Sequence, residues 1–343
     1  EEALQIAASF NGPSQNVMIA SSTGRIAWTL CGYLPNRVGF DGRWPVSWAN
    51  AETGWAGALP ESLRPSAIDP PGGMLYTANN RTVHLSVARR IGRNWASGTR
   101  AARIGELLRD QESMVERDHL AIQLDAQSQA HEIYRDTILT IITDDESDPR
   151  LRRAREVAAA WDGTANADQR AYALLRAYRS ALVRAVVDPL VAPCRELEPN
   201  FIYGWTQSEE SVLRILEEEP PHLLPSEFES WNQLRRAALI AAIDRLERRD
   251  LPIDARWGRV NATRIHHPIA QSVPLLGRWL NMPQRPQSGD WGVVRVAAPG
   301  AGASERLVVS PGREEDAIFH MPAGQSGHFL SDHFDAGHFD WLD

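Results

Sequence analysis

Two adjacent asparagines and an arginine stand where a short extended segment ends. The stretch GGMLYTANNR, residues 72–81, leaves a Pro-Pro-Gly-Gly turn, and its apolar run predicts a strand over residues 74–78. Asn79, Asn80 and Arg81 follow directly. A carboxamide can donate a hydrogen bond to the oxyanion of a tetrahedral intermediate, although asparagine is more commonly a plain turn residue. The residues alone leave both roles open, with the turn as the commoner one.

The C-terminal stretch offers a second group of reactive side chains. GQSG, residues 324–327, lacks the final glycine of a G-x-S-x-G nucleophile elbow, so a tight glycine turn is favoured. His266-His267 precedes a proline and is typical of a loop start with structural histidines. The tail could hold a divalent metal, but its spacing matches no known ligand pattern, and a polar tail is favoured. The tail residues are His320, His328, His333, His338, Asp332, Asp335 and Asp340.

Three stretches must position these groups. Residues 1–100 are predicted to form a hairpin, around Ser22-Thr23-Gly24, and then a Gly/Pro/Trp-rich loop packed against other parts of the protein. Residues 101–285 show apolar residues at helical spacing and are predicted to be helical, including one stretch over 113–142. Residues 286–343 return to short strands and a C-terminal tail. Strands at both ends with helices between them predict one sheet with a large helical insertion.

Composition limits the class of protein. The 343 residues have an ordinary globular composition, 43% hydrophobic and 23% charged, and all 36 basic residues are arginine. The net charge of −8 argues against a nucleic-acid partner, and no apolar run is long enough to span a membrane. The acidic N-terminus predicts a helix rather than a signal peptide. Cys31 and Cys194 cannot form a disulfide framework or a four-cysteine zinc site, and whether they form one bridge stays open.

Five segments, in order along the chain, together resemble the penicillin acylase (penicillin amidase) family of N-terminal-nucleophile hydrolases. The resemblance runs from near the start to near the end, and it matches the C-terminal portion of the family's β-subunit. It implies an α+β fold that is part of an αββα sandwich. The segments are NVMIASSTGRIAWTLCGYLPNR, WAGALPESLRPSAIDPPGGMLYTANNR, RAARIGELL, AAAWDG and MPAGQSGHFLSDHF.

The resemblance implies roles for two residues. In this family a serine freed at the start of the β-subunit attacks the amide carbonyl, and its own α-amine acts as the base. Asn79 falls on the asparagine that donates to the oxyanion, and Arg100 on the arginine that orients it. Asn80 and Arg81 would then shape the turn. The substrate would be a small acyl amide, linear or cyclic, as in penicillins, acyl-homoserine lactones and lipopeptides.

The sequence also departs from the family pattern. Glu1 is no nucleophile and no SNW-like start occurs, so we expect the serine to lie upstream and this chain to be inactive alone. Its partners would be an α-subunit and the N-terminal part of the β-subunit. Calcium occurs in some members, and Gly42 could supply a backbone ligand, but the expected carboxylate between Asn79 and Arg100 is absent. We therefore expect no calcium and no other cofactor.

The resemblance also predicts a periplasmic or secreted location and, for a fragment with uncovered sheet edges, self-association. Two hypotheses from other classes stay open. One is a non-catalytic module in which several of the twelve tryptophans bind a sugar or peptidoglycan fragment. The other, weaker, is a metal hydrolase built on the C-terminal histidines and aspartates.

Overall fold

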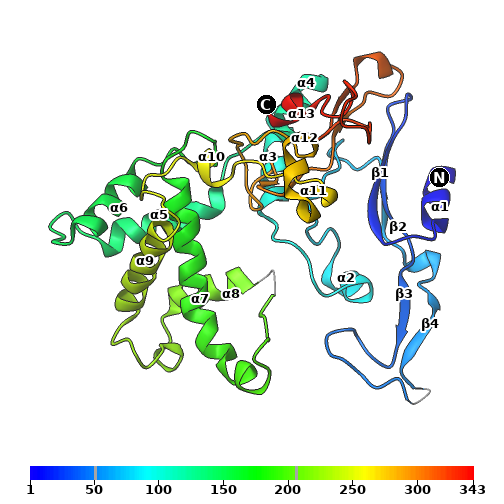
Figure 1. Ribbon diagram of the computed structural model, residues 1–343. Coiled ribbons are helices and arrows are strands. Elements are labelled where there is room, and N and C mark those ends of the chain that lie inside the picture. The colour runs from blue at the N-terminus through cyan, green and yellow to red at the C-terminus, as the bar shows by residue number, and fades with distance from the viewer. Residues whose placement is uncertain (50–51, 205–207) are drawn as a thin grey trace. The chain divides into compact units, whose positions relative to one another are not determined.

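The computed structural model describes residues 1–49, 52–204 and 208–343, which divide into two compact units. Unit 1 comprises Glu1–Glu116 with Val309–Ala317, and unit 2 comprises Arg117–Val308 with Ile318–Asp343. Small antiparallel sheets and many helices make the fold α+β, as predicted (Figure 1).

Unit 1 contains the predicted hairpin. Strands β1 (Gln15–Ala20) and β2 (Ile26–Cys31) pair antiparallel from Gln15↔Cys31 to Ala20↔Ile26, and β5 (Ser66–Ile68) adds to β2. Gly24 closes the turn at a φ of 80°, a conformation that glycine adopts without strain. The N-terminal helix α1 (Glu2–Ser9) lies along β2 (Figure 1), which confirms the helix expected there.

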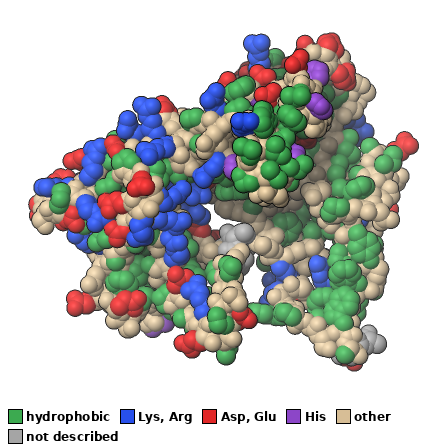
Figure 2. All heavy atoms as spheres, viewed as in Figure 1, with side chains coloured by type: hydrophobic (Ala, Val, Ile, Leu, Met, Phe, Trp, Pro, Cys, Tyr) green, Lys and Arg blue, Asp and Glu red, His purple; other side chains and the backbone are tan. Residues whose placement is uncertain are grey.

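A second ribbon follows, formed by β3 (Pro35–Val38) and β4 (Gly54–Ala58). The small core nearby consists of Trp28, Leu30, Leu34 and Leu59. The prediction that the whole tryptophan-rich loop is packed down is wrong among the described residues. Three of its tryptophans are mainly exposed, and green apolar atoms dominate over β3 and β4 in Figure 2; they are Trp44 (72%), Trp48 (55%) and Trp55 (53%).

Helices α2 (Leu85–Ile91) and α3 (Thr99–Arg109) complete unit 1, apart from the start of α4 (Glu116–Gln123). The helix predicted over 113–142 is interrupted after α4. There the backbone pairs elsewhere, because Ala165 N donates to Ala126 O (2.8 Å) and Ser128 N to Gly163 O (2.8 Å). Tertiary pairing of this kind overrides a helical pattern.

Unit 2 is mainly helical, as the apolar spacing predicted. Asp148 and Ser230 cap the starts of α6 (Pro149–Ala159) and α9 (Trp231–Glu247) by accepting from Arg150 N (2.8 Å) and Gln233 N (3.2 Å). The other helices are α5 (Glu132–Ile141), α7 (Tyr172–Leu197), α8 (Ser208–Glu218), α10 (Trp257–Val260), α11 (Pro268–Ser272), α12 (Gly277–Leu280) and α13 (His338–Leu342).

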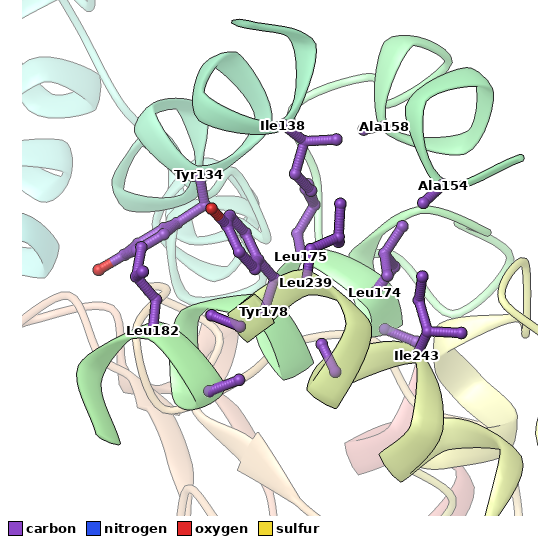
Figure 3. Close-up of a cluster of buried hydrophobic side chains, with 14 of the residues drawn as sticks. Tyr134, Ile138, Ala154, Ala158, Leu174, Leu175, Tyr178, Leu182, Leu239 and Ile243 are labelled. Carbon is purple, nitrogen blue, oxygen red and sulfur yellow. The ribbon is translucent and has the colours of Figure 1, made fainter. Parts of the chain in front are cut away.

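The main hydrophobic core, here called the helical core, lies between α5, α6, α7 and α9 (Figure 3). Side chains from all four helices point into one apolar centre in that view, among them Ile138, Ala154, Leu175 and Leu239. Burying such side chains stabilises a fold by about 1.5–3 kcal/mol each. Helix α7 also carries Pro189 and Pro193 within its span.

The C-terminal strands are shorter than predicted. β8 (Arg306–Val308) pairs with β9 (Ile318–His320), and β6 (Ala297–Ala298) pairs with β7 (Ala301–Gly302). Residues 291–296 form turns, because Arg295 N donates to Asp125 O (2.8 Å) instead of to a neighbouring strand. Within the described ranges these strands form sheets of their own, so the single sheet predicted from both chain ends is not observed.

Candidate functional site

Asn79 lies in a tight bend, the Asn79 turn (residues 77–81). The predicted strand over 74–78 is wrong: this stretch has no strand pairing in the described part of the chain. The Ala78 N–H donates to the side chain of Asn80 (3.0 Å), as does the Thr77 hydroxyl (3.3 Å), and Asn80 Nδ2 donates to Arg81 O (3.2 Å). Asn80 therefore shapes the turn through an Asx-type hydrogen bond.

The backbone of Asn79 is left-handed, with a φ of 64°. Asparagine is one of the few residues other than glycine that tolerates this region, because its short polar side chain bonds locally. The Asn79 carbonyl accepts from Ala96 N (2.9 Å). The turn is thus tied by its main chain to the segment that leads into α3.

Arg100, in the first turn of α3, holds the Asn79 side chain. Its Nη2 donates to Asn79 Oδ1 (2.9 Å) and to Ala78 O (2.9 Å), so the two residues that the family resemblance singled out lie together. Guanidinium nitrogens are donors only, so the amide atom facing Arg100 must be the oxygen. Burial lowers the pKa of Arg100, but arginine stays charged at neutral pH.

In this arrangement the oxygen of the Asn79 amide is bound to Arg100, and its Nδ2 group stays available as a donor. Among the residues that the structure describes, none accepts a hydrogen bond from Asn79 Nδ2, and the side chain is exposed. Arg100 has no acidic partner within the same described ranges. The site therefore offers an oriented N–H donor beside a guanidinium whose charge no carboxylate neutralises, which favours negative charge on a bound group.

Sequence reasoning missed one positioning contact, between Tyr76 and α3. A Cβ on Gly105 would lie 2.6 Å from the Tyr76 hydroxyl oxygen, so the ring rests directly on the helix backbone. Arg109 Nη1 also lies 3.4 Å from that oxygen. A glycine inside an otherwise amphipathic helix is the signal that could have revealed this contact.

The loop after β3 does not suit calcium at Gly42. Asp41 is bound by Arg43, whose Nε lies 2.6 Å from Oδ2, and by Arg93, whose Nη2 lies 3.0 Å from Oδ2. Arg93 Nε also donates to Asp41 O (2.7 Å). The Arg37 Nε lies 3.2 Å from the position a Cβ on Gly42 would take. Two guanidinium groups on the Asp41 carboxylate and a third beside Gly42 oppose a divalent cation.

The other candidate residues are not brought together. No group of three or more metal-binding side chains occurs in the described residues. His338 is buried, with Nδ1 2.7 Å from Pro322 O and Nε2 3.2 Å from Pro283 O, which is a structural environment. His267 caps α11 by accepting from Ile269 N (3.1 Å). Both cysteines are free, Cys31 buried and Cys194 exposed.

GQSG forms a close backbone contact. Gly324 N donates to Phe334 O (3.0 Å), and a Cβ on Gly324 would lie 1.8 Å from His333 O, so only glycine fits there. Ser326 Oγ accepts from His328 N (3.1 Å). This serine stabilises a turn.

Comparisons with known proteins bear on the whole chain. A family model described as penicillin amidase matches residues 1–343. The chain is 27% identical over 346 residues to the penicillin acylase 2 proenzyme of Pseudomonas sp. (strain SE83), with 96% of this chain and 43% of that protein covered. It is 25% identical over 372 residues to the acyl-homoserine lactone acylase QuiP of Pseudomonas aeruginosa, with 95% and 43% covered.

A solved structure of a thermostable penicillin G acylase from Alcaligenes faecalis has a similar fold, with a TM-score of 0.58 at 19% identity, covering 99% of this chain and 65% of that one. This likeness supports the predicted α+β fold class. The chain spans 43% of the length of the two curated relatives. No described helix is both long and apolar enough to cross a membrane.

Proposed function

The chain belongs to the penicillin amidase family, and on that premise we propose that it forms part of an amidohydrolase that releases an acyl group from an amine. In this proposal Asn79 supplies the oxyanion donor and Arg100 positions it. The observation that carries the proposal is the pairing of Asn79 Oδ1 with Arg100 Nη2 at 2.9 Å, which leaves Nδ2 available to donate to a bound group.

The reaction needs a nucleophile from outside these 343 residues. A serine hydroxyl attacks the amide carbonyl carbon, and the serine's own α-amine takes the hydroxyl proton. The carbonyl oxygen becomes negative and accepts the hydrogen bond from Asn79 Nδ2. The C–N bond then breaks, the leaving amine takes the proton from the α-ammonium group, and water hydrolyses the acyl-serine ester. The proposed partners are therefore an α-subunit and the rest of the β-subunit.

Asn79 and Arg100 suit this role because they change no protonation state. A neutral amide donates a hydrogen bond without transferring its proton, and it needs no reorganisation if its rotamer is already fixed. Arg100 fixes that rotamer through Oδ1, and its charge adds a favourable potential for the oxyanion. The named relatives act on penicillins and acyl-homoserine lactones, and we propose a linear or cyclic acyl amide of this kind as substrate.

The test uses the intact protein and two neighbouring asparagines. Asn79→Ala is expected to lower kcat roughly 10²–10³-fold, the usual loss for one oxyanion donor. Asn80→Ala is the matched control, because Asn80 bonds only within the turn in the contacts described, and kcat should change much less. Equal losses in the two variants would overturn the role of Asn79.

Arg100 has its own test. Arg100→Ala is expected to lower kcat with little change in KM, because the guanidinium orients Asn79 rather than binding substrate directly. Arg100→Lys should recover only part of kcat, since the shorter lysine side chain does not place its ammonium where Nη2 meets both oxygens. The 343-residue chain alone is expected to be inactive, and turnover by it would contradict the need for an external serine.

By resemblance we also propose a periplasmic or secreted location, which fractionation of cells would test.

A second candidate function rests on a different observation, an exposed aromatic cluster on the β3–β4 ribbon. The ring centroids of Trp48 and Trp55 lie 5.6 Å apart, with Phe40 6.2 Å from Trp48 and Tyr33 6.3 Å from Trp55. Exposed indoles of this kind can stack on sugar rings. Titration with peptidoglycan fragments should quench tryptophan fluorescence in the wild type and not in Trp55→Ala; unchanged fluorescence in both would exclude the sugar-binding function.

A further inference from the structure

One residue of unit 1, Asp41, is held at two oxygens by a single guanidinium. Arg93 Nε donates to the Asp41 carbonyl oxygen (2.7 Å), while its Nη2 lies 3.0 Å from the carboxylate Oδ2. A carbonyl and a carboxylate oxygen are the kind of ligands that a calcium ion takes. Here the planar guanidinium meets both at once, a geometry that suits arginine and not lysine. The positive charge next to Asp41 is therefore supplied by a side chain of the protein, Arg93, and not by a bound cation.

A second contact runs in the opposite direction. Arg37, on β3, donates through Nη1 to the carbonyl oxygen of Arg90, at the end of α2 (2.9 Å). Arg93 lies two residues after α2 and reaches back to the loop that follows β3. The two arginines thus cross between the same two segments of unit 1. We call the contacts of Arg37 with Arg90 and of Arg93 with Asp41 the arginine brace.

The brace lies next to the candidate site in the chain. Arg93 is followed by the segment whose Ala96 N–H donates to the Asn79 carbonyl (2.9 Å), and then by Arg100, which holds the Asn79 side chain. Both contacts to Asn79 therefore come from residues a few positions after Arg93. If Arg93 is released, the residues that make both contacts to Asn79 lose their anchor on the N-terminal side.

We propose that the arginine brace replaces a bound metal ion as the device that fixes the segment between Asn79 and Arg100. Arg93 is then a positioning residue for Asn79, and the order of this segment is independent of calcium. The expected effect on turnover rests on the proposed function. The expected effect on backbone order does not, so the two can fail separately.

The experiment measures hydrogen exchange of the peptide that contains Ala96 in the intact protein, with calcium added and with a chelator. In the wild type the exchange rate is expected to be the same under both conditions. Arg93→Ala should raise it about 3- to 10-fold, the effect of losing one partly exposed ion pair and one hydrogen bond. Arg93→Lys should fall between the two, because it keeps the charge and loses the second donor.

Arg89→Ala is the matched control, since Arg89 is exposed on α2, four residues before Arg93, and makes no hydrogen bond or ion pair among the described contacts, and it should leave exchange unchanged. Equal exchange in Arg93→Ala and Arg89→Ala would overturn the brace. Chelator-induced exchange in the wild type would overturn its independence of metal.

Activity gives the second readout. Arg93→Ala should lower kcat with KM unchanged, and Arg93→Lys should restore part of kcat. If exchange responds as expected but Asn79→Ala keeps full turnover, the brace stands and the proposed function fails. If exchange rises and kcat does not change in Arg93→Ala, the positioning role of Arg93 fails.

Discussion

The Asn79 turn and the helical core use arginine in opposite ways. In unit 2 Arg179 pairs with Glu209, with Nη2 2.7 Å from Oε2, and Glu209 also accepts from the Tyr134 hydroxyl (2.6 Å). That hydrogen-bonded carboxylate raises the pKa of Arg179. In unit 1 Arg100 meets only neutral oxygens in the described contacts, and burial lowers its pKa. The charge of Arg179 is paired with a carboxylate and serves the structure, whereas the charge of Arg100 has no carboxylate partner in the described contacts and lies next to an available amide.

The two regions also differ in the kind of interaction that stabilises them. The helical core consists of buried side chains such as Ile138, Leu174 and Leu239, which contact one another from several helices. The Asn79 turn is exposed and is held by directional hydrogen bonds. We infer that stability depends mainly on the first kind of region, and that the geometry of the site depends on the second.

The largest expected effect on stability is a cavity in the helical core. Ile138→Ala removes a fully buried side chain (0% exposed) and should lower the free energy of unfolding by about 2–5 kcal/mol. Ile133→Ala, on the same helix and 46% exposed, is the control and should cost far less. Urea denaturation of both variants would measure the difference, and similar losses would contradict the description of this core.

A pH dependence should come from the same region. His131 is buried, with Nδ1 2.8 Å from Ser128 Oγ, and burial lowers its pKa from 6.5 to about 4, aided by the charge of Arg179. The folded ring is neutral between these values while the unfolded ring is protonated. The free energy of unfolding should therefore fall as pH drops from about 6.5 to 4, by roughly 3 kcal/mol from this group.

His131→Gln should flatten that dependence relative to the wild type in denaturation curves measured at several pH values. His222→Gln, at an exposed position, should not alter the slope. An unchanged slope in His131→Gln would show that other groups cause the acid sensitivity.

The smallest effect is expected at the Asn79 turn. Asn79→Ala should cost about 1 kcal/mol, because alanine is strained at a φ of 64°, whereas Asn79→Gly should cost less than alanine. Thermal unfolding of the two variants would measure this order. A loss at Asn79 as large as that of Ile138→Ala would remove the distinction between the two regions.

Local sequence signals predicted the parts of the fold that depend on local structure. Gly24 indicated the β1–β2 turn, and apolar spacing indicated α7 and α9. The strand over 74–78 failed because the Asn80 side chain, not a neighbouring strand, takes the Ala78 amide. Apolar composition alone could not show this competition.

The site itself was open to prediction only through the family resemblance. Asn79 and Arg100 are 21 positions apart, and no local rule pairs an amide with a guanidinium at that distance. The contact of Arg93 with Asp41 spans 52 positions, and no motif in the sequence indicates it. Such contacts follow from tertiary geometry, which residue type and spacing do not specify.

The two prolines inside α7 separate a first part that resists local unfolding from a last part that unfolds more easily. Pro189 and Pro193 have no N–H group, so the carbonyls one turn earlier lose their usual partners. The stretch before them is largely buried, whereas near the end Leu190 is about half exposed (49%) and Leu197 is almost fully exposed (90%). Proteases should therefore nick this helix first over its last two turns, and a loop insertion there should disturb the fold less than one near Tyr178.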